Sequence, residues 1–353
     1  MADPFDTSLP LPYRLAMLVV TGTWLWGFAL ELVKPLGRLV GLPNLQHQST
    51  YTFSSIISAP IIFSAVTWTI FANSENATPP ILRYLPHLTL LLTLLAFVPI
   101  HIKGLSLPRN GRSKLASSLK RVSIGGLAAS EDSKFGDVLL ADALTSYARP
   151  VSQLYVALCM VLPKYSHLGE AVTIPGGTYL IPLLVAYPFL IRLRQCLISR
   201  PRQVANAIKY ATAFPPIVVG ALMSRGGVDP AGRSVLQHWW IFFALLNSGY
   251  SLWWDIFKDW DLWGISSRDR NNHKRFGGLT IRCILIVIVD SVLRFSWLSR
   301  VSVRLDVYEF QEKTVFLLEI MEVVRRWLWL LFRAETEAIR RRVDEFELAS
   351  PPS

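Results

Sequence analysis

The sequence predicts an all-α polytopic membrane protein with about nine transmembrane helices. Of its 353 residues, 52% are hydrophobic and only 17% are charged, which is too apolar for an ordinary soluble domain. The apolar residues also fall into runs of about 20, long enough to cross the hydrocarbon of a bilayer. The net charge of +11 lies mostly in short blocks between these runs, where the positive-inside rule explains it, so nucleic-acid binding is not expected.

A first transmembrane unit is predicted over residues 13–102, after a polar tail over residues 1–12. Its three apolar runs cover residues 13–33, 51–72 and 81–102. The first run has neither a basic leader nor a small-residue cleavage site, so it is expected to be a retained helix. Asn76, in the short turn between the second and third runs, begins an Asn-x-Thr pattern and is a glycosylation candidate.

The next segment, residues 103–134, has no sustained apolar run and is predicted to be a basic loop. Six further spans are predicted over residues 135–333. They cover residues 135–162, 178–197, 204–223, 236–257, 279–298 and 314–332. Pro150 is expected to kink the first of these, and a re-entrant break there would change the number of spans. Residues 334–353 form a polar tail.

Charge in the loops predicts the orientation of the chain. The loops after the first, third, fifth and seventh spans, together with the C-terminal tail, hold most of the basic residues and are therefore assigned to the cytosol. The same assignment places Asn76 in the lumen, where glycosylation occurs. The N-terminal tail is then lumenal and the C-terminal tail cytosolic.

A polar stripe marks the seventh predicted span. Asn247, Ser251, Asp255 and Asp259 follow one another at steps of four and share one face of a helix. An ionisable group at membrane depth costs about 2.5–3.5 kcal/mol on insertion scales, so the stripe predicts a substrate or ion path. The alternative is that the two carboxylates sit at the helix end, among the lipid headgroups, and only cap the span.

Other spans also carry ionisable residues. Asp290 and Arg294 are four apart and can pair on one face of the eighth span. Arg325 and Arg326 are flanked by apolar residues on both sides, so snorkelling to the interface does not explain them. A further two cations could be either interface anchors or groups of a path; these are Arg192 and Lys209.

These charges predict a path for an anion. If Arg192, Lys209, Arg294, Arg325 and Arg326 converge, the aspartates Asp142, Asp255, Asp259 and Asp290 neutralise them only in part. Arginine forks suit phosphate or carboxylate oxygens. The alternative is a set of polar locks between helices. No phosphate loop, metalloprotease motif or nucleophile arrangement is present, and the three cysteines show no ligand spacing, so neither an enzyme, a metal site nor a cofactor is predicted.

Five segments resemble the EXS-domain family, which includes eukaryotic phosphate exporters and a yeast Golgi protein needed to retain lumenal ER proteins. The segments are FGDVLLADALTS (135–146), RLRQCL with NAIKYATAF (192–197 and 206–214), NSGYSLWWDIFKDWDL (247–262), DSVLRFSW (290–297) and EVVRRWLWLLFRAETE (322–337). The resemblance covers about residues 44–337. The SPX regulatory domain and the extra span of the exporters have no counterpart here, so the short Golgi form is expected.

The resemblance also implies a site. Its phosphate-binding residues would be Asp142, Thr145, Arg192, Lys209, Tyr210, Arg294, Arg325 and Arg326. Its gate and path-lining residues would be Asp255, Asp259, Asp290 and Trp297. Thr145 stands where exporters often have asparagine, and its hydroxyl can still bind phosphate.

The expected function is movement of inorganic phosphate from the Golgi lumen to the cytosol, in support of glycosylation and of retention of Golgi and ER residents. Expected partners are phosphate, membrane lipid and Golgi sorting or glycosyltransferase-recycling proteins at the cytosolic loops, and a homodimer is a further candidate. The alternative function is a Golgi scaffold or receptor that retains glycosyltransferases without transport. A third interpretation, a membrane transferase acting on a phosphate-bearing lipid, lacks a recognisable base and nucleophile.

Overall fold

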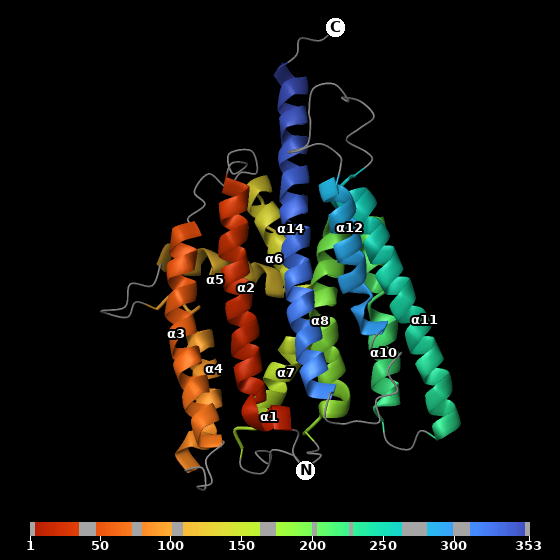
Figure 1. The fold of residues 1–353 in the computed structure, drawn as a ribbon. Coiled ribbons are helices and arrows are strands. Elements are labelled where there is room, and N and C mark those ends of the chain that lie inside the picture. The colour runs from red at the N-terminus through yellow and green to blue at the C-terminus, as the bar shows by residue number, and fades with distance from the viewer. Residues whose placement is uncertain are drawn as a thin grey trace.

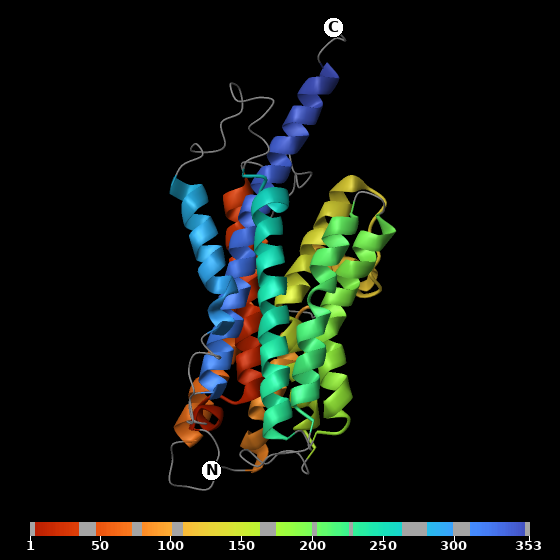
Figure 2. The ribbon, with the colours of Figure 1, turned by 90° about the vertical axis from the view of Figure 1, so that its right-hand side faces the viewer.

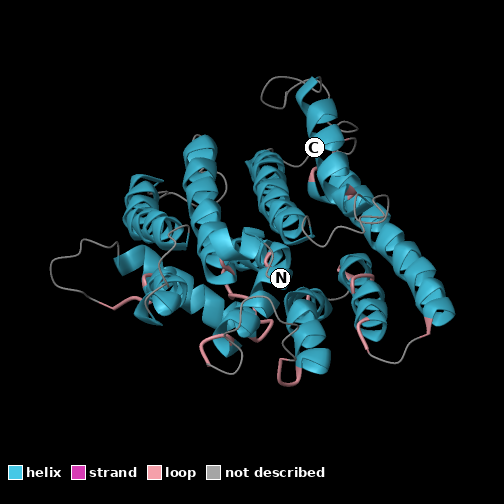
Figure 3. Ribbon diagram, turned by 60° about the horizontal axis from the view of Figure 1, so that its bottom comes forward, coloured by secondary structure: helices cyan, strands magenta, loops and turns pink. Residues whose placement is uncertain are grey.

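The chain folds into a bundle of helices, and no strand occurs in the part of the chain that the structure describes (Figure 3). The computed structural model describes residues 4–34, 47–72, 80–100, 109–162, 174–199, 203–225, 229–262, 281–298 and 311–349. The all-α prediction is therefore confirmed. Asn76 and the basic residues of the segment 263–280 lie outside these ranges.

The first unit holds two long helices and two shorter ones. Its elements are α1 (Pro4–Ser8), α2 (Leu11–Val33), α3 (His47–Ala72), the 3-10 turn η2 (Pro80–Tyr84) and α4 (Leu85–Leu95). α2 packs against both α3 and α4. The Tyr13 hydroxyl joins α2 to α3, since it lies 2.6 Å from Ser64 Oγ.

Two segments of the first half differ from the sequence prediction. The third apolar run forms a helix of only 11 residues, α4. Pro86 lies in its first turn, where proline is tolerated, and Pro99 follows its end. The segment predicted as a basic loop contains α5 (Arg109–Ser123). α5 is fixed to the next helix by Asp137, whose carboxylate accepts bonds from Arg121 Nε at 3.0 Å and Nη2 at 2.9 Å. These bonds raise the pKa of the Arg121 guanidinium.

The second half supplies the helices around the charged residues. They are α6 (Glu131–Ser146), α7 (Ala148–Cys159), α8 (Gly177–Ile198), α9 (Val204–Ala211), α10 (Phe214–Met223), α11 (Pro230–Trp254), the π turn η4 (Asp255–Asp259), α12 (Ile281–Arg294), the 3-10 turn η5 (Ser296–Leu298) and α14 (Gln311–Ala349). α14 packs against α2, α6 and α12, and so joins the two halves.

Two predicted spans are interrupted. The fourth is broken at Tyr147, between α6 and α7, because Pro150 has no N–H to bond the carbonyl four residues earlier, at Ser146. The sixth is broken between α9 and α10, just ahead of Pro215 and Pro216. Both interruptions occur beside predicted site residues.

Successive spans alternate in direction, and α2 begins at the opposite end of the bundle from the end of α14 (Figures 1 and 2). We name these ends the N-terminal face, where α2 begins, and the C-terminal face, where α14 ends. Three helical segments are long and apolar enough to cross a membrane by length and composition, at Leu11–Val33, Ser49–Ala72 and Gly177–Ile198. The fold is that of a helical membrane protein. α14 continues as a helix through most of the segment predicted as a tail.

Candidate functional site

The first cluster of charged side chains lies beside the broken helix α6. Asp142 is 3% exposed, and its Oδ1 accepts bonds from Arg192 Nε at 2.8 Å and from the Tyr210 hydroxyl at 2.5 Å. The Arg192 guanidinium also stacks over the Tyr210 ring, 4.8 Å from its centroid. These three predicted residues come from α6, α8 and α9 and meet at one point.

Arg192 is oriented further by Gln195, three residues on along α8. Its Nη1 donates to Gln195 Oε1 at 2.6 Å. The amide nitrogen of Gln195 in turn donates to the Gly126 carbonyl at 3.0 Å, in the turn before α6. The Arg192 guanidinium is therefore held on two sides, by Asp142 and by Gln195.

The second cluster surrounds Asp255, at the end of α11. Its carboxylate is 1% exposed and accepts Lys209 Nζ at 2.7 Å on Oδ1 and Arg294 Nη2 on Oδ2. Arg325 Nη1 lies 4.0 Å from the same Oδ2. One carboxylate thus faces three cations. Asp255 is therefore enclosed by protein and paired, rather than exposed at the end of the span.

A π turn, rather than a continued α-helix, carries the second aspartate of the stripe. In η4 the Trp260 N–H donates to the Asp255 carbonyl, five residues back, so the helix widens by one residue at this point. Asp259 then accepts Lys209 Nζ at 3.3 Å and Trp254 Nε1 at 3.2 Å. π turns are frequent at functional sites.

The third cluster joins α12 to α14. Arg294 Nε donates to Asp290 Oδ2 at 3.1 Å, so the pair predicted from their spacing of four is present. Arg325 Nη1 donates to Asp290 Oδ1 at 3.1 Å, and its Nη2 donates to Glu322 Oε1 at 2.6 Å. The Arg325 guanidinium therefore binds two carboxylates, those of Asp290 and Glu322.

Arg326, the next residue, has a different environment. Its Nε donates to the Ser146 hydroxyl at 3.0 Å and its Nη2 to the Thr145 hydroxyl at 2.9 Å, and its guanidinium lies 4.9 Å from the Trp329 ring centroid. Within the described residues no carboxylate lies within 4.0 Å of this guanidinium, and its Nη1 donates no hydrogen bond. In that part of the chain it is the predicted site cation without an ion pair.

The charge balance of the site differs from the sequence prediction. The five cations were expected to exceed their carboxylates, but Glu322 joins the four aspartates. The pairs are Arg192 with Asp142, Lys209 with Asp255 and Asp259, Arg294 with Asp255 and Asp290, and Arg325 with Asp290 and Glu322. The argument for an anion site therefore rests on Arg326 rather than on an excess of positive charge.

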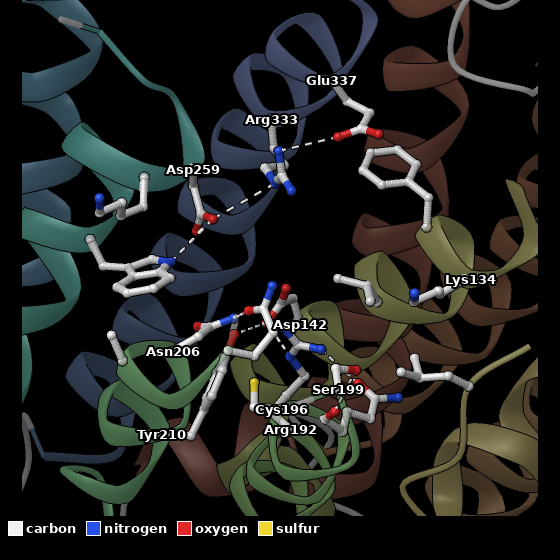
Figure 4. Close-up of a pocket in the computed structure, with 18 of the residues that line it drawn as sticks. Lys134, Asp142, Arg192, Cys196, Ser199, Asn206, Tyr210, Asp259, Arg333 and Glu337 are labelled. Carbon is white, nitrogen blue, oxygen red and sulfur yellow. Dashed lines mark hydrogen bonds and ion pairs between the residues drawn. The ribbon is translucent and has the colours of Figure 1, made fainter. Parts of the chain in front are cut away.

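A cavity of about 810 Å³ leads from the C-terminal face to the first cluster (Figure 4). Asp142, Arg192 and Tyr210 line its inner end, while Lys134 and Arg340 line it near the C-terminal face. Thr145 lies one turn further along α6, and its hydroxyl donates to the Asp142 carbonyl at 2.7 Å. The Arg326 site thus lies just beyond the inner end of the cavity.

The predicted gate, Trp297, lies in η5 after Arg294. Its Nε1 donates to the Ser248 hydroxyl in α11 at 3.1 Å, and its ring meets Trp240 edge-on, with centroids 5.4 Å apart. Because α12 runs from the C-terminal face into the bundle (Figure 1), Trp297 lies on the N-terminal side of Arg294. Trp297 and Trp240 of α11 therefore form an aromatic contact on the N-terminal side of Arg294.

The sequence prediction did not include Arg333, Glu322 and Ser146 in the site. Arg333 lines the cavity and lies 3.7 Å from Asp259 Oδ1 and 3.6 Å from Glu337 Oε2 (Figure 4). Its position seven residues after Arg326, on the same face of α14, was a usable signal. Ser146 carried no signal of its own, because serine is common in helices that cross membranes.

The helical architecture and the buried ion pairs define a polytopic membrane protein with a charged interior that opens at one end. The chain belongs to the EXS family, whose pattern it matches over residues 9–339. It is 27% identical to Protein ERD1 homolog 2 of Schizosaccharomyces pombe, over 94% of this chain and 97% of the relative.

Two other relatives show the breadth of the family. Protein ERD1 of Kluyveromyces lactis is 26% identical, over 96% of each chain. Solute carrier family 53 member 1 of Mus pahari is 28% identical over 58% of this chain and 32% of the relative. The matches to the two ERD1 proteins span nearly the whole of each relative.

Proposed function

We propose that this protein carries inorganic phosphate from the Golgi lumen to the cytosol. The observation that carries the proposal is Arg326, a guanidinium at the centre of the bundle with two hydroxyl partners and no ion pair among the described residues. A guanidinium fork binds phosphate oxygens through parallel, charge-assisted hydrogen bonds. The hydroxyls of Thr145 and Ser146 would complete the cradle.

The paired cations would have a different task. Bound to carboxylates, Arg192, Lys209 and Arg294 attract an anion less strongly than free cations would, which keeps binding weak enough for release. Exchange of carboxylate partners for phosphate oxygens would pass the anion from one cluster to the next. The motif resemblance favours phosphate as that anion, and the solute carrier name of one relative favours transport.

The direction follows from the loop charges, which assign the C-terminal face to the cytosol. In that orientation the cavity opens to the cytosol, and Trp297 with Trp240 stands between the site and the lumen. The arrangement is that of a carrier ready to release or accept phosphate on the cytosolic side. Recycling of phosphate left by lumenal glycosylation would give such a carrier its role.

The direct test is uptake of radiolabelled phosphate into liposomes that contain the purified protein, with phosphate gradients in both directions. We expect uptake by the wild type and none in protein-free liposomes. Lys313→Gln is the matched control, because it removes an exposed cation at the start of α14, away from the cavity lining. If folded wild-type protein moves no phosphate under any gradient, the proposal is wrong.

Trp297→Ala provides a second prediction. Removal of the indole opens the space beside Trp240 and frees the Ser248 hydroxyl, so we expect faster passive phosphate flux and poorer retention of a preset gradient. Efflux from preloaded liposomes measures both. Flux equal to that of the wild type would show that the path does not pass this tryptophan.

A scaffold that retains glycosyltransferases is the second candidate function. The observation that favours it is the C-terminal part of α14, which projects beyond the other helices (Figure 1). Removal of residues 342–353, beyond the last cavity-lining residue of α14, would then disturb enzyme retention, whereas Arg326→Gln would not. The opposite pattern would favour the carrier.

A further inference from the structure

Helix α2 lies outside the predicted six-helix core but contacts the interruption between α6 and α7. Tyr147 is the residue at this interruption, with φ −97° and ψ 13°. Its hydroxyl donates to the Leu18 carbonyl of α2 at 3.1 Å. A hydrogen bond therefore links α2, in the first predicted unit, to the residue at which the helix between α6 and α7 is interrupted.

Gly22 allows the Tyr147 ring to approach α2 so closely. A Cβ atom at Gly22 would collide with the Tyr147 hydroxyl oxygen and would lie 3.3 Å from Cζ. Leu18 and Gly22 are one helical turn apart, so the phenol tip fits over one turn of α2. The tyrosine ring is rigid and cannot shorten, so any larger residue at Gly22 must displace it together with its backbone.

The interruption supplies the hydroxyls that hold Arg326. Thr145 and Ser146 directly precede Tyr147 in the chain, and their hydroxyl oxygens lie 2.9 Å and 3.0 Å from the guanidinium nitrogens of Arg326. Ser146 also donates to Glu322 Oε1 at 2.8 Å. A displacement of Tyr147 by even about half an ångström would misalign bonds of this length.

We propose that Gly22 and Tyr147 are positioning residues: α2 holds the α6–α7 interruption in the shape that places Thr145 and Ser146 against Arg326. The first helical unit is then part of the binding machinery, although no charged residue of the site lies in it. The consequence for phosphate rests on the proposed function. The consequence for the shape of the interruption does not.

The test is a double-mutant cycle between the two residues. Gly22→Ala is expected to weaken phosphate binding roughly tenfold, the effect of losing one good hydrogen bond to a charged group. Gly22→Ala with Tyr147→Phe is expected to recover most of that loss, because the atom that collides is the hydroxyl oxygen. Equilibrium binding of radiolabelled phosphate to the full-length protein gives the four dissociation constants, those of the wild type, Gly22→Ala, Tyr147→Phe and the double variant.

Gly27→Ala separates positioning from general damage to α2. A Cβ at Gly27 would lie 2.9 Å from the Tyr51 ring, which packs α3 against α2 and not against the interruption. We expect Gly27→Ala to lower the Tm while leaving phosphate affinity unchanged. An equal loss of affinity in Gly22→Ala and Gly27→Ala would overturn the proposal.

Hydrogen exchange provides a readout that needs no phosphate. Backbone amides over residues 143–149 should exchange faster in Gly22→Ala and return most of the way to the wild-type rate in the double variant. If phosphate binding is absent in the wild type but this exchange pattern is present, the proposed function fails and the positioning role stands. Unchanged exchange in Gly22→Ala, or failure of Tyr147→Phe to restore it, would refute the positioning role.

Discussion

Replacing Arg326 with glutamine is expected to reduce phosphate uptake strongly while leaving the fold nearly intact. Because this guanidinium has no carboxylate within 4.0 Å among the described residues, its removal leaves no buried charge without a partner. The loss of a charge-assisted bond to phosphate costs about 1.5–3 kcal/mol, which corresponds to a roughly 10–150-fold weaker affinity. Radiolabelled uptake and a thermal melt measure the two effects.

The adjacent residue is the matched control. Arg325→Gln removes the shared partner of Asp290 and Glu322, so we expect a large loss of Tm together with the loss of uptake. Arg326→Lys keeps the charge but not the fork and should fall between the wild type and Arg326→Gln. If Arg326→Gln transports normally, or if it melts as early as Arg325→Gln, the role assigned to the unpaired guanidinium is wrong.

The second large effect is expected for Asp255→Asn, chiefly on stability. The substitution keeps the size of the side chain but removes the negative charge that Lys209 and Arg294 share. Breaking a buried ion pair by removal of one partner costs about 3–5 kcal/mol, because the other charge stays buried. We expect a protein that melts many degrees earlier and purifies poorly.

Asp261→Asn is the corresponding surface control. Asp261 pairs with Arg340 at 3.4 Å, and the arginine side chain is 39% exposed. Surface pairs of this kind contribute about 0–1 kcal/mol, so little change in Tm is expected. A substitution at Asp255 as mild as that at Asp261 would mean that the remaining partners, Asp259 and Asp290, suffice to neutralise Lys209 and Arg294. The purified proteins are compared by thermal unfolding in the same detergent.

Most of the information needed to find the site is present in the sequence. Charged residues within apolar runs are rare because burial in hydrocarbon is costly, so Arg294, Arg325 and Arg326 are conspicuous from their positions in the chain. The pairing of Asp290 with Arg294 follows from helical spacing alone. The helical class is equally plain, since only helices or closed barrels satisfy backbone polar groups inside a bilayer.

Spacing could not predict how the charges would be divided among partners. Glu322 is four residues from Arg326 but three from Arg325, and both spacings place side chains on one face. Only the packing of α6 against α14 decided these partners. The Thr145 and Ser146 hydroxyls accept hydrogen bonds from Arg326, while Glu322 binds Arg325. The prediction of excess positive charge was wrong for the same reason.

The sequence by itself determined the helical class, the family resemblance and the identity of the ionisable residues, because composition and local periodicity encode these properties. The tertiary structure decided which cation lacks an ion pair among the described residues, where the cavity ends and that Gly22 of α2 abuts Tyr147. These features depend on contacts between helices more than a hundred residues apart in the chain. Such contacts follow from side-chain packing across the bundle, which local sequence patterns do not specify.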